Sequence, residues 1–210
     1  MNNIPTVTKN LLAINVLMFL ALLAGRKLGV DLNANLGLHF YMSQEFMPYQ
    51  LFTYMFMHGD ISHIFFNMFA LWMFGRIVEY DLGSKRFLTY YLVCGVGAGL
   101  IQLAVNYVEV SSLLAQGYMS VPRFTTVGAS GAVFGLLLAY GMLHPNNVIM
   151  LMFPPIALKA KWFVVIYGVL ELMGGVASSG SNVAHFAHLG GMLFGFVLLR
   201  YWKKNNKIWY

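Results

Sequence analysis

Charged residues and cysteine are both scarce in this chain of 210 residues. Only 10% of the residues are Asp, Glu, Lys or Arg, whereas 59% are hydrophobic, and ordinary soluble domains contain about 25% charged residues. So few charges could not cover the surface of a soluble domain. We therefore predict an integral membrane protein with a single domain, residues 1–210. The only cysteine, Cys94, excludes an intrachain disulfide and gives no indication of a redox site or a cysteine-based metal site.

Acidic residues are also few, with 7 Asp and Glu against 13 Lys and Arg. In a soluble protein a basic excess can indicate a nucleic acid partner. Here the basic residues are scattered at the ends of apolar segments, which is typical of a protein oriented in a lipid bilayer. We expect the bilayer as a partner and no nucleic acid.

The chain contains six apolar segments that are candidates for membrane-spanning helices. They cover approximately residues 10–24, 61–78, 87–106, 128–143, 162–177 and 184–201. The first has features of a signal peptide, but no soluble domain follows it, so we expect a retained helix. Another apolar stretch, 148–158, is too short to cross a bilayer and contains Pro154 and Pro155. We interpret that stretch as a linker at one membrane face.

Six spans place both termini on the same side of the membrane. If that side is cytoplasmic, the inner loops and ends contain ten basic residues and the outer loops three, Arg26, Lys27 and Arg123. Basic residues accumulate on the cytoplasmic side of membrane proteins. The predicted fold is therefore an all-α bundle of six transmembrane helices with both termini inside.

Polar side chains inside apolar segments are candidates for function because burying them in a membrane is unfavourable. His63 and Asn67 lie four residues apart in the second segment, on one helix face. The fourth segment contains Ser130, and the sixth contains His188. Counted from the cytoplasmic ends, all four lie roughly 14 to 21 Å above the inner boundary of the bilayer core. They would reach a cavity that opens to the outer side.

Stripes of small residues follow the serine and the histidine. They are Gly131-x-x-x-Gly135 in the fourth segment and Gly191-x-x-x-Gly195 in the sixth. Small residues four apart allow two helix backbones to approach closely. Parallel packing along these stripes would bring the serine hydroxyl and the imidazole together.

A neutral imidazole can activate a serine hydroxyl as a nucleophile. Acyl transfer also requires hydrogen-bond donors where the oxyanion forms. His63 and Asn67 could supply such donors, together with the backbone N–H groups at the start of the Ser130 helix. The residues alone therefore favour a serine hydrolase site within the membrane.

Three motifs occur in order along nearly the whole chain. They are H-x-x-x-N in the second segment (His63, Asn67), G-x-S-G in the fourth (Gly128, Ser130, Gly131) and A-H-x-x-G-x-x-x-G in the sixth (Ala187, His188, Gly191, Gly195). Together they resemble the motifs of the rhomboid family of intramembrane serine proteases. The resemblance implies a six-helix core and a Ser–His dyad that cleaves transmembrane proteins in or near their membrane helix.

The resemblance also implies a role for individual residues. Ser130 would be the nucleophile and His188 the general base, and His63 and Asn67 would stabilise the oxyanion. Phe134 falls where an aromatic ring packs against the catalytic histidine. His58 and Glu79, the latter in Gly75-x-x-x-Glu79, match positions that are structural in the family. The resemblance further implies a multi-pass protein of a bacterial cytoplasmic membrane, with the active site open to the outer side.

The chain departs from the family pattern in the first outer loop. It has Tyr49-Gln50 where some members have Trp-Arg, which leaves the anchoring of that loop open. Two further polar residues lie in apolar segments without an assigned role. We expect His185 to face the short last loop or solvent, and Glu171 to make a structural hydrogen bond or to extend outward to the membrane surface.

Other classes of function fit the sequence less well. No HExxH motif or cluster of three ligands indicates a metal, and we expect no cofactor. A small transporter would show inverted repeats and broken helices, which are not evident here. A catalytically weak relative that only binds membrane proteins is the remaining alternative, although such proteins typically lose the serine or the histidine.

Overall fold

A computed structural model describes residues 4–118, 124–151, 155–177 and 184–205 of the chain. Most of these residues are helical. The long helical segments are α1 (Thr6–Lys27), α4 (Ile61–Ala70) continued by the π-helical turn η2 (Leu71–Gly75) and α5 (Arg76–Leu82), α6 (Ser84–Ala115), α7 (Ser130–Leu143), α8 (Ala160–Ala177) and α9 (His185–Lys204). The short ones are α2 (Leu32–Leu36), α3 (Gln50–Thr53) and the 3-10 turn η1 (Tyr54–Phe56).

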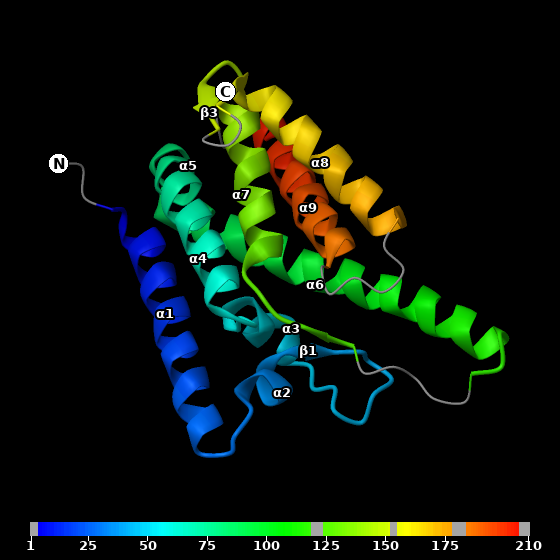
Figure 1. Cartoon of the computed structure of the whole chain (residues 1–210). Helices are drawn as coiled ribbons and strands as arrows, with labels where there is room; N and C mark the ends of the chain where they lie inside the picture. The colour runs from blue at the N-terminus through cyan, green and yellow to red at the C-terminus, as the bar shows by residue number, and fades with distance from the viewer. Residues whose placement is uncertain (1–3, 119–123, 152–154, 178–183, 206–210) are drawn as a thin grey trace.

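Four of the described helices are long and apolar enough to cross a membrane. They are Thr6–Lys27, Ile61–Leu82, Ser84–Ala115 and Ala160–Ala177. The apolar helix α7 is shorter, with 14 residues. Consecutive long helices alternate in direction, so the start of α1 and the end of α9 lie toward the same end of the bundle (Figure 1). The count of six spans and their orientation stay predictions.

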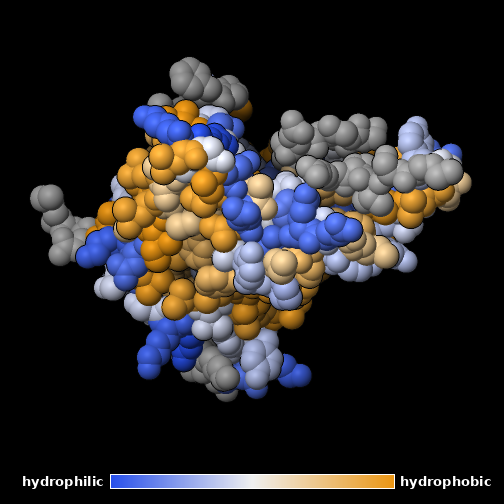
Figure 2. Space-filling view, turned by 90° about the horizontal axis from the view of Figure 1, so that it is seen from below, coloured by the Kyte–Doolittle hydropathy of each residue, from blue (hydrophilic) through white to orange (hydrophobic). Residues whose placement is uncertain are grey.

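Large apolar side chains cover much of the outer surface of the bundle. On α8 they include Val165, Ile166, Val169, Leu170, Leu172, Met173 and Val176. Soluble monomers rarely expose such extended apolar patches, so these faces are suited to contact with lipid. Figure 2 looks onto the end that bears α2 and β1, where hydrophilic residues gather across the middle of the face.

Two short β pairs depart from the all-α prediction. β1 (Leu38–His39) pairs antiparallel with β2 (Thr125–Thr126), just before α7. β3 (Val148–Met150) pairs antiparallel with β4 (Ala157–Lys159), in the stretch expected to be a linker at one membrane face. Strand pairing satisfies backbone N–H and C=O groups that a membrane face does not solvate fully. Pro154 lies outside the described residues.

Helix α7 occupies the centre of the bundle. Nine of its residues are buried, among them Leu136, Ala139 and Tyr140, and α9 packs along both α6 and α7. A helix that is apolar on every side is expected to be surrounded by other elements. Helix α7 has only 14 residues and begins with Ser130. Its first turn lies within the bundle rather than at its end (Figure 1).

A buried carboxylate connects α5 to the start of α1. Oε1 of Glu79 accepts hydrogen bonds from the Val7 N–H at 3.0 Å and the Ser84 hydroxyl at 2.7 Å. Oε2 accepts from the N–H and the hydroxyl of Thr8, at 2.7 and 2.8 Å. A negative charge is favourable at the N-terminus of a helix, so this contact fixes α1 against the rest of the bundle.

Replacing this carboxylate should destabilise the protein. The Glu79→Ala variant leaves the buried N–H and hydroxyl of Thr8 without an acceptor, at a cost of about 1–3 kcal/mol for an unsatisfied group. It also removes the bonds to Val7 and Ser84. We expect a lower unfolding temperature in detergent, measured by circular dichroism. Glu109→Ala, which removes an exposed carboxylate from α6, is the control. Equal unfolding temperatures for the two variants would contradict the role of Glu79.

Candidate active site

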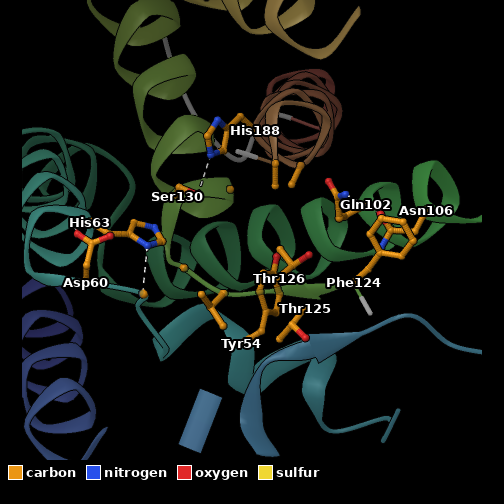
Figure 3. A pocket seen from close by; sticks show the side chains of 16 residues that line it. Tyr54, Asp60, His63, Gln102, Asn106, Phe124, Thr125, Thr126, Ser130 and His188 are labelled. Atoms are coloured by element: carbon orange, nitrogen blue, oxygen red, sulfur yellow. Dashed lines mark hydrogen bonds between the residues drawn. The ribbon is translucent and has the colours of Figure 1, made fainter. Parts of the chain in front are cut away.

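The hydroxyl of Ser130 and the imidazole of His188 meet between two helices. Ser130 is the first residue of α7, and His188 lies in the first turn of α9. Ser130 Oγ is 2.8 Å from His188 Nε2, a hydrogen-bond distance. Figure 3 shows the two side chains pointing toward each other across the cavity. An imidazole nitrogen in this position can accept the proton of the serine hydroxyl.

The aromatic ring of Phe134 fixes the orientation of the His188 imidazole. Phe134 lies one turn after Ser130 on α7, and its ring stacks on that of His188 with centroids 4.3 Å apart and an interplanar angle of 6°. Stacking leaves both nitrogens of the His188 ring, which lie in the ring plane, free for hydrogen bonds. The His188 ring cannot rotate far without losing its stacking contact with Phe134.

Glycines allow α7 and α9 to approach until their backbones touch. A Cβ atom at Gly191 would collide with the backbone of Gly131, and one at Gly135 would lie 3.3 Å from the carbonyl oxygen of Gly191. Further along, a Cβ at Gly195 would collide with the Tyr90 side chain of α6. Each of the four glycines thus excludes a side chain where helices cross, as small-residue stripes do in membrane bundles.

A cavity of about 690 Å³ surrounds the serine and the histidine. Its wall combines α4, α6, α7, α9 and the segment before α7, and it includes Tyr54, His63, Gln102, Asn106 and Thr126 (Figure 3). Among the described residues, no group of three His, Cys, Asp or Glu side chains is arranged to hold a metal ion. The lining has room for an extended peptide segment beside Ser130.

The imidazole of His63 faces the cavity as a hydrogen-bond donor. Its Nδ1 accepts the backbone N–H of Gly59 at 3.3 Å, so the ring proton of the neutral form belongs on Nε2. The carboxylate of Asp60 caps α4 by accepting the His63 N–H at 2.9 Å, which fixes where the helix begins. Nε2 therefore presents an N–H toward the start of α7.

Gly128 provides the space in front of that N–H. It has φ +132°, a backbone conformation that side chains rarely adopt. A Cβ atom there would lie 2.7 Å from Nε2 of His63, and the Gly128 N–H is held by the carbonyl of Tyr54 at 2.9 Å. The first backbone N–H groups of α7 have no partner within the helix, and α7 begins two residues after Gly128.

Asn67 is placed differently from the sequence-based expectation of a side chain lining the cavity. It is buried one turn below His63, and its Nδ2 donates to the His63 carbonyl at 3.0 Å. It is not among the residues that line the cavity. The spacing correctly predicted that His63 and Asn67 share one face of α4. Of the two, only His63 reaches the cavity wall.

His58 lies behind His63 and is fully buried. The two rings make an edge-on contact with centroids 5.0 Å apart. Burial, and next the neighbouring His63, lower the pKa of His58 to about 4, so its ring is neutral near pH 7. A neutral ring supports His63 without placing a second positive charge beside it.

The first outer loop is anchored by an amide. The buried Gln50 accepts the N–H groups of His39 and Met47 at 3.3 and 3.1 Å. Its Nε2 donates to the carbonyls of Asn35 and Glu45 at 3.2 and 3.0 Å. The first outer loop, which has Tyr49-Gln50 where some family members have Trp-Arg, is thus anchored by the neutral side chain of Gln50, which connects both halves of the loop.

Glu171 and His185 lie beside His188, although neither was assigned a role from the sequence. Oε2 of Glu171 lies 2.9 Å from Nδ1 of His188 and 2.7 Å from Nδ1 of His185. The His185 ring turns to α8 and not to solvent, and the short loop lies outside the described residues. Glu171 makes a hydrogen bond, one of its two expected arrangements, and does not extend outward. Depth was an available signal, because Glu171 follows Lys161 by ten residues, roughly 15 Å along a helix. That lies near the lower end of the range of roughly 14 to 21 Å predicted for the four polar residues of the site.

Comparison with known proteins identifies relatives over most of the chain. Residues 45–204 match the family described as Rhomboid domain. The chain is 30% identical over 200 residues to the Rhomboid protease GluP of Bacillus subtilis, covering 93% of this chain and 34% of that protein. It is 34% identical over 146 residues to RHOMBOID-like protein 12, mitochondrial, of Arabidopsis thaliana, covering 67% and 42% of the two chains.

A third relative is Rhomboid protein 1, mitochondrial, of Saccharomyces cerevisiae. The identity is 30% over 140 residues, which cover 67% of this chain and 38% of that protein. The chain thus spans less than half the length of these three relatives.

The contact between α7 and α9 yields a testable prediction. In the Gly191→Ala variant the new methyl group must separate the two backbones, which should lower the unfolding temperature and break the bond between Ser130 and His188. We expect covalent labelling by a fluorophosphonate to be largely lost. Gly168→Ala is the control, because its Cβ would meet only the Met192 side chain at 3.5 Å. Unchanged labelling of Gly191→Ala would refute the close contact.

Proposed function

This chain belongs to the rhomboid family, and on that premise we propose that it is an intramembrane serine endopeptidase. Its substrates would be transmembrane proteins, cleaved within or near the outer end of their membrane helix. The observation that supports the proposal most strongly is the distance of 2.8 Å between Ser130 Oγ and His188 Nε2. The reaction needs no cofactor and no metal.

In the proposed mechanism Ser130 is the nucleophile and His188 the general base. As Oγ attacks the scissile carbonyl, its proton passes to Nε2 of His188, and the same proton then passes to the leaving amine. Water hydrolyses the resulting acyl-enzyme by the same transfers in reverse. The stacked ring of Phe134 supports this role, because it keeps Nε2 directed at the serine.

The oxyanion would be stabilised by His63 and the backbone N–H groups at the start of α7. Donors contribute most where charge develops in a site that excludes water. The bond from Gly59 to Nδ1 of His63 supports an Nε2–H donor. Asn67 would be a weaker donor, or would act by holding His63, because its amide is already bonded to the His63 carbonyl.

Substrate access follows from the depth of the site. We propose a single domain with six transmembrane helices, both termini in the cytoplasm and the cavity open to the outer side of a bacterial cytoplasmic membrane. A substrate helix must unwind to place a carbonyl beside Ser130. Helix-destabilising residues near its outer end should therefore favour cleavage. A relative that only binds membrane proteins would not require the hydrogen bond between Ser130 and His188.

Loss of the nucleophile should abolish proteolysis. We expect the purified protein in liposomes to cleave a transmembrane substrate with a glycine near its outer end, and Ser130→Ala to show no cleavage above background. Cleavage is measured by gel electrophoresis and mass spectrometry of the products. Chelator should leave the rate unchanged. Cleavage by Ser130→Ala at the wild-type rate would sink the proposal.

Removal of the oxyanion donors should lower kcat with little change in KM. We expect His63→Ala to lose about 10²–10³ in kcat, the usual effect of one donor. Asn67→Ala should lose less, because His63 and the backbone donors remain. Both variants should keep measurable turnover in the same liposome assay. Wild-type kcat in a folded His63→Ala protein would show that the second span is merely structural.

A further inference from the structure

The carboxylate of Glu171 is hydrogen-bonded to two imidazoles at once. Oε2 lies 2.9 Å from Nδ1 of His188 and 2.7 Å from Nδ1 of His185, and the Glu171 side chain is only 14% exposed. A carboxylate inside a membrane-spanning helix is unfavourable unless it is paired. The two ring N–H groups supply that pairing, so the side chain is directed inward from α8 toward α9.

The bond to Glu171 decides which tautomer His188 adopts. A neutral imidazole has one N–H, and a carboxylate can only accept a hydrogen bond. The contact with Glu171 therefore requires the proton on Nδ1. Nε2, which lies 2.8 Å from Ser130 Oγ, then has a free lone pair, and only this tautomer can accept the serine proton.

We propose that Glu171 is a positioning residue for His188, so that Ser130, His188 and Glu171 form a triad in place of a dyad. This inference rests on the proposed function. As the bond between Oγ and the carbonyl carbon forms, the serine proton moves to Nε2 and His188 becomes an imidazolium. Glu171 keeps its negative charge and stabilises that cation. The proton leaves Nε2 for the amine as the C–N bond breaks, and Glu171 is never protonated.

His185 holds the carboxylate in place. It lies three residues before His188 on α9, so the two rings face α8 from the same side. Gly174 of α8 leaves room for the His185 ring, since a Cβ there would lie 2.9 Å from its Nδ1. With two donors on one oxygen, the Glu171 side chain is fixed between the helices. His185 thus supports the triad without touching the serine.

The groups around His188 determine how its charge responds to pH. Among the described residues, the titratable side chains that face it are Glu171 on α8, His185 on α9 and His63 on α4. From α7 it meets the hydroxyl of Ser130 and the neutral ring of Phe134. Glu171 is the one negative charge among these groups. Its removal would leave an imidazolium at His188 without a counter-charge.

The first test compares wild-type protein with Glu171→Gln by the rate of fluorophosphonate labelling between pH 5 and 9. We expect the rate to rise with pH in both, as His188 loses its proton. In Glu171→Gln the labelling rate at the high-pH plateau should fall at least about tenfold. Loss of the equivalent carboxylate in Ser–His–Asp proteases lowers the rate about 10⁴-fold. The pH of half-maximal rate should also fall, which a purely structural contact between α8 and α9 would not cause.

Two further variants complete this comparison. Glu109→Gln, which changes an exposed carboxylate on α6, should leave the plateau and the midpoint unchanged. His185→Ala should lose less than Glu171→Gln, because the bond from Glu171 to His188 remains, and its midpoint should not fall. A larger loss in His185→Ala than in Glu171→Gln would overturn the assignment of the carboxylate as the partner of His188.

The second test does not depend on activity. Nitrogen-15 NMR of labelled histidine should show the proton of neutral His188 on Nδ1 in the wild type and a mixture of tautomers in Glu171→Gln. The same tautomer populations in both proteins would overturn the inference. If the spectra differ as expected but Ser130 of the wild type is not labelled, the proposed function fails and the pairing of Glu171 with His188 stands.

Discussion

The contact between the backbones of α7 and α9 is the constraint on which the site depends. A Cβ atom at Gly191 would collide with the backbone of Gly131 where the two helices cross. Only at that separation can the short side chain of Ser130 reach Nε2 of His188 at 2.8 Å. In a membrane, helices associate through close packing rather than a hydrophobic driving force, so the glycines at this crossing determine both the packing of the bundle and the chemistry of the site.

Buried polar groups form the second level of this organisation, and several of those at the site are held by hydrogen bonds. Asp60 caps α4 and so fixes His63, Tyr54 holds Gly128, and Glu171 holds His188. Because unpaired polar groups are unfavourable inside a membrane, these bonds restrict each side chain to one arrangement. On the proposed function, the donors, the base and the nucleophile are thereby oriented before a substrate arrives, which is the condition for electrostatic catalysis.

Much of the site could be predicted from the sequence because its parts lie on regular helices. A constant rise per residue relates position to depth, which brought Ser130, His188 and His63 to one level. The same rule did not reveal that Asn67 turns to the His63 carbonyl or that Glu171 turns inward, because side-chain direction depends on neighbouring helices. The β1–β2 and β3–β4 pairs were missed because two or three residues give no periodic signal.

The most direct test of this account is a crystal structure of the protein after reaction with a fluorophosphonate. The account predicts phosphorus bonded to Oγ of Ser130. It also predicts the phosphoryl oxygen about 2.7–3.1 Å from both Nε2 of His63 and a backbone N–H at the start of α7, with Glu171 still bonded to Nδ1 of His188. An adduct on another residue, or a phosphoryl oxygen directed away from His63, would contradict it.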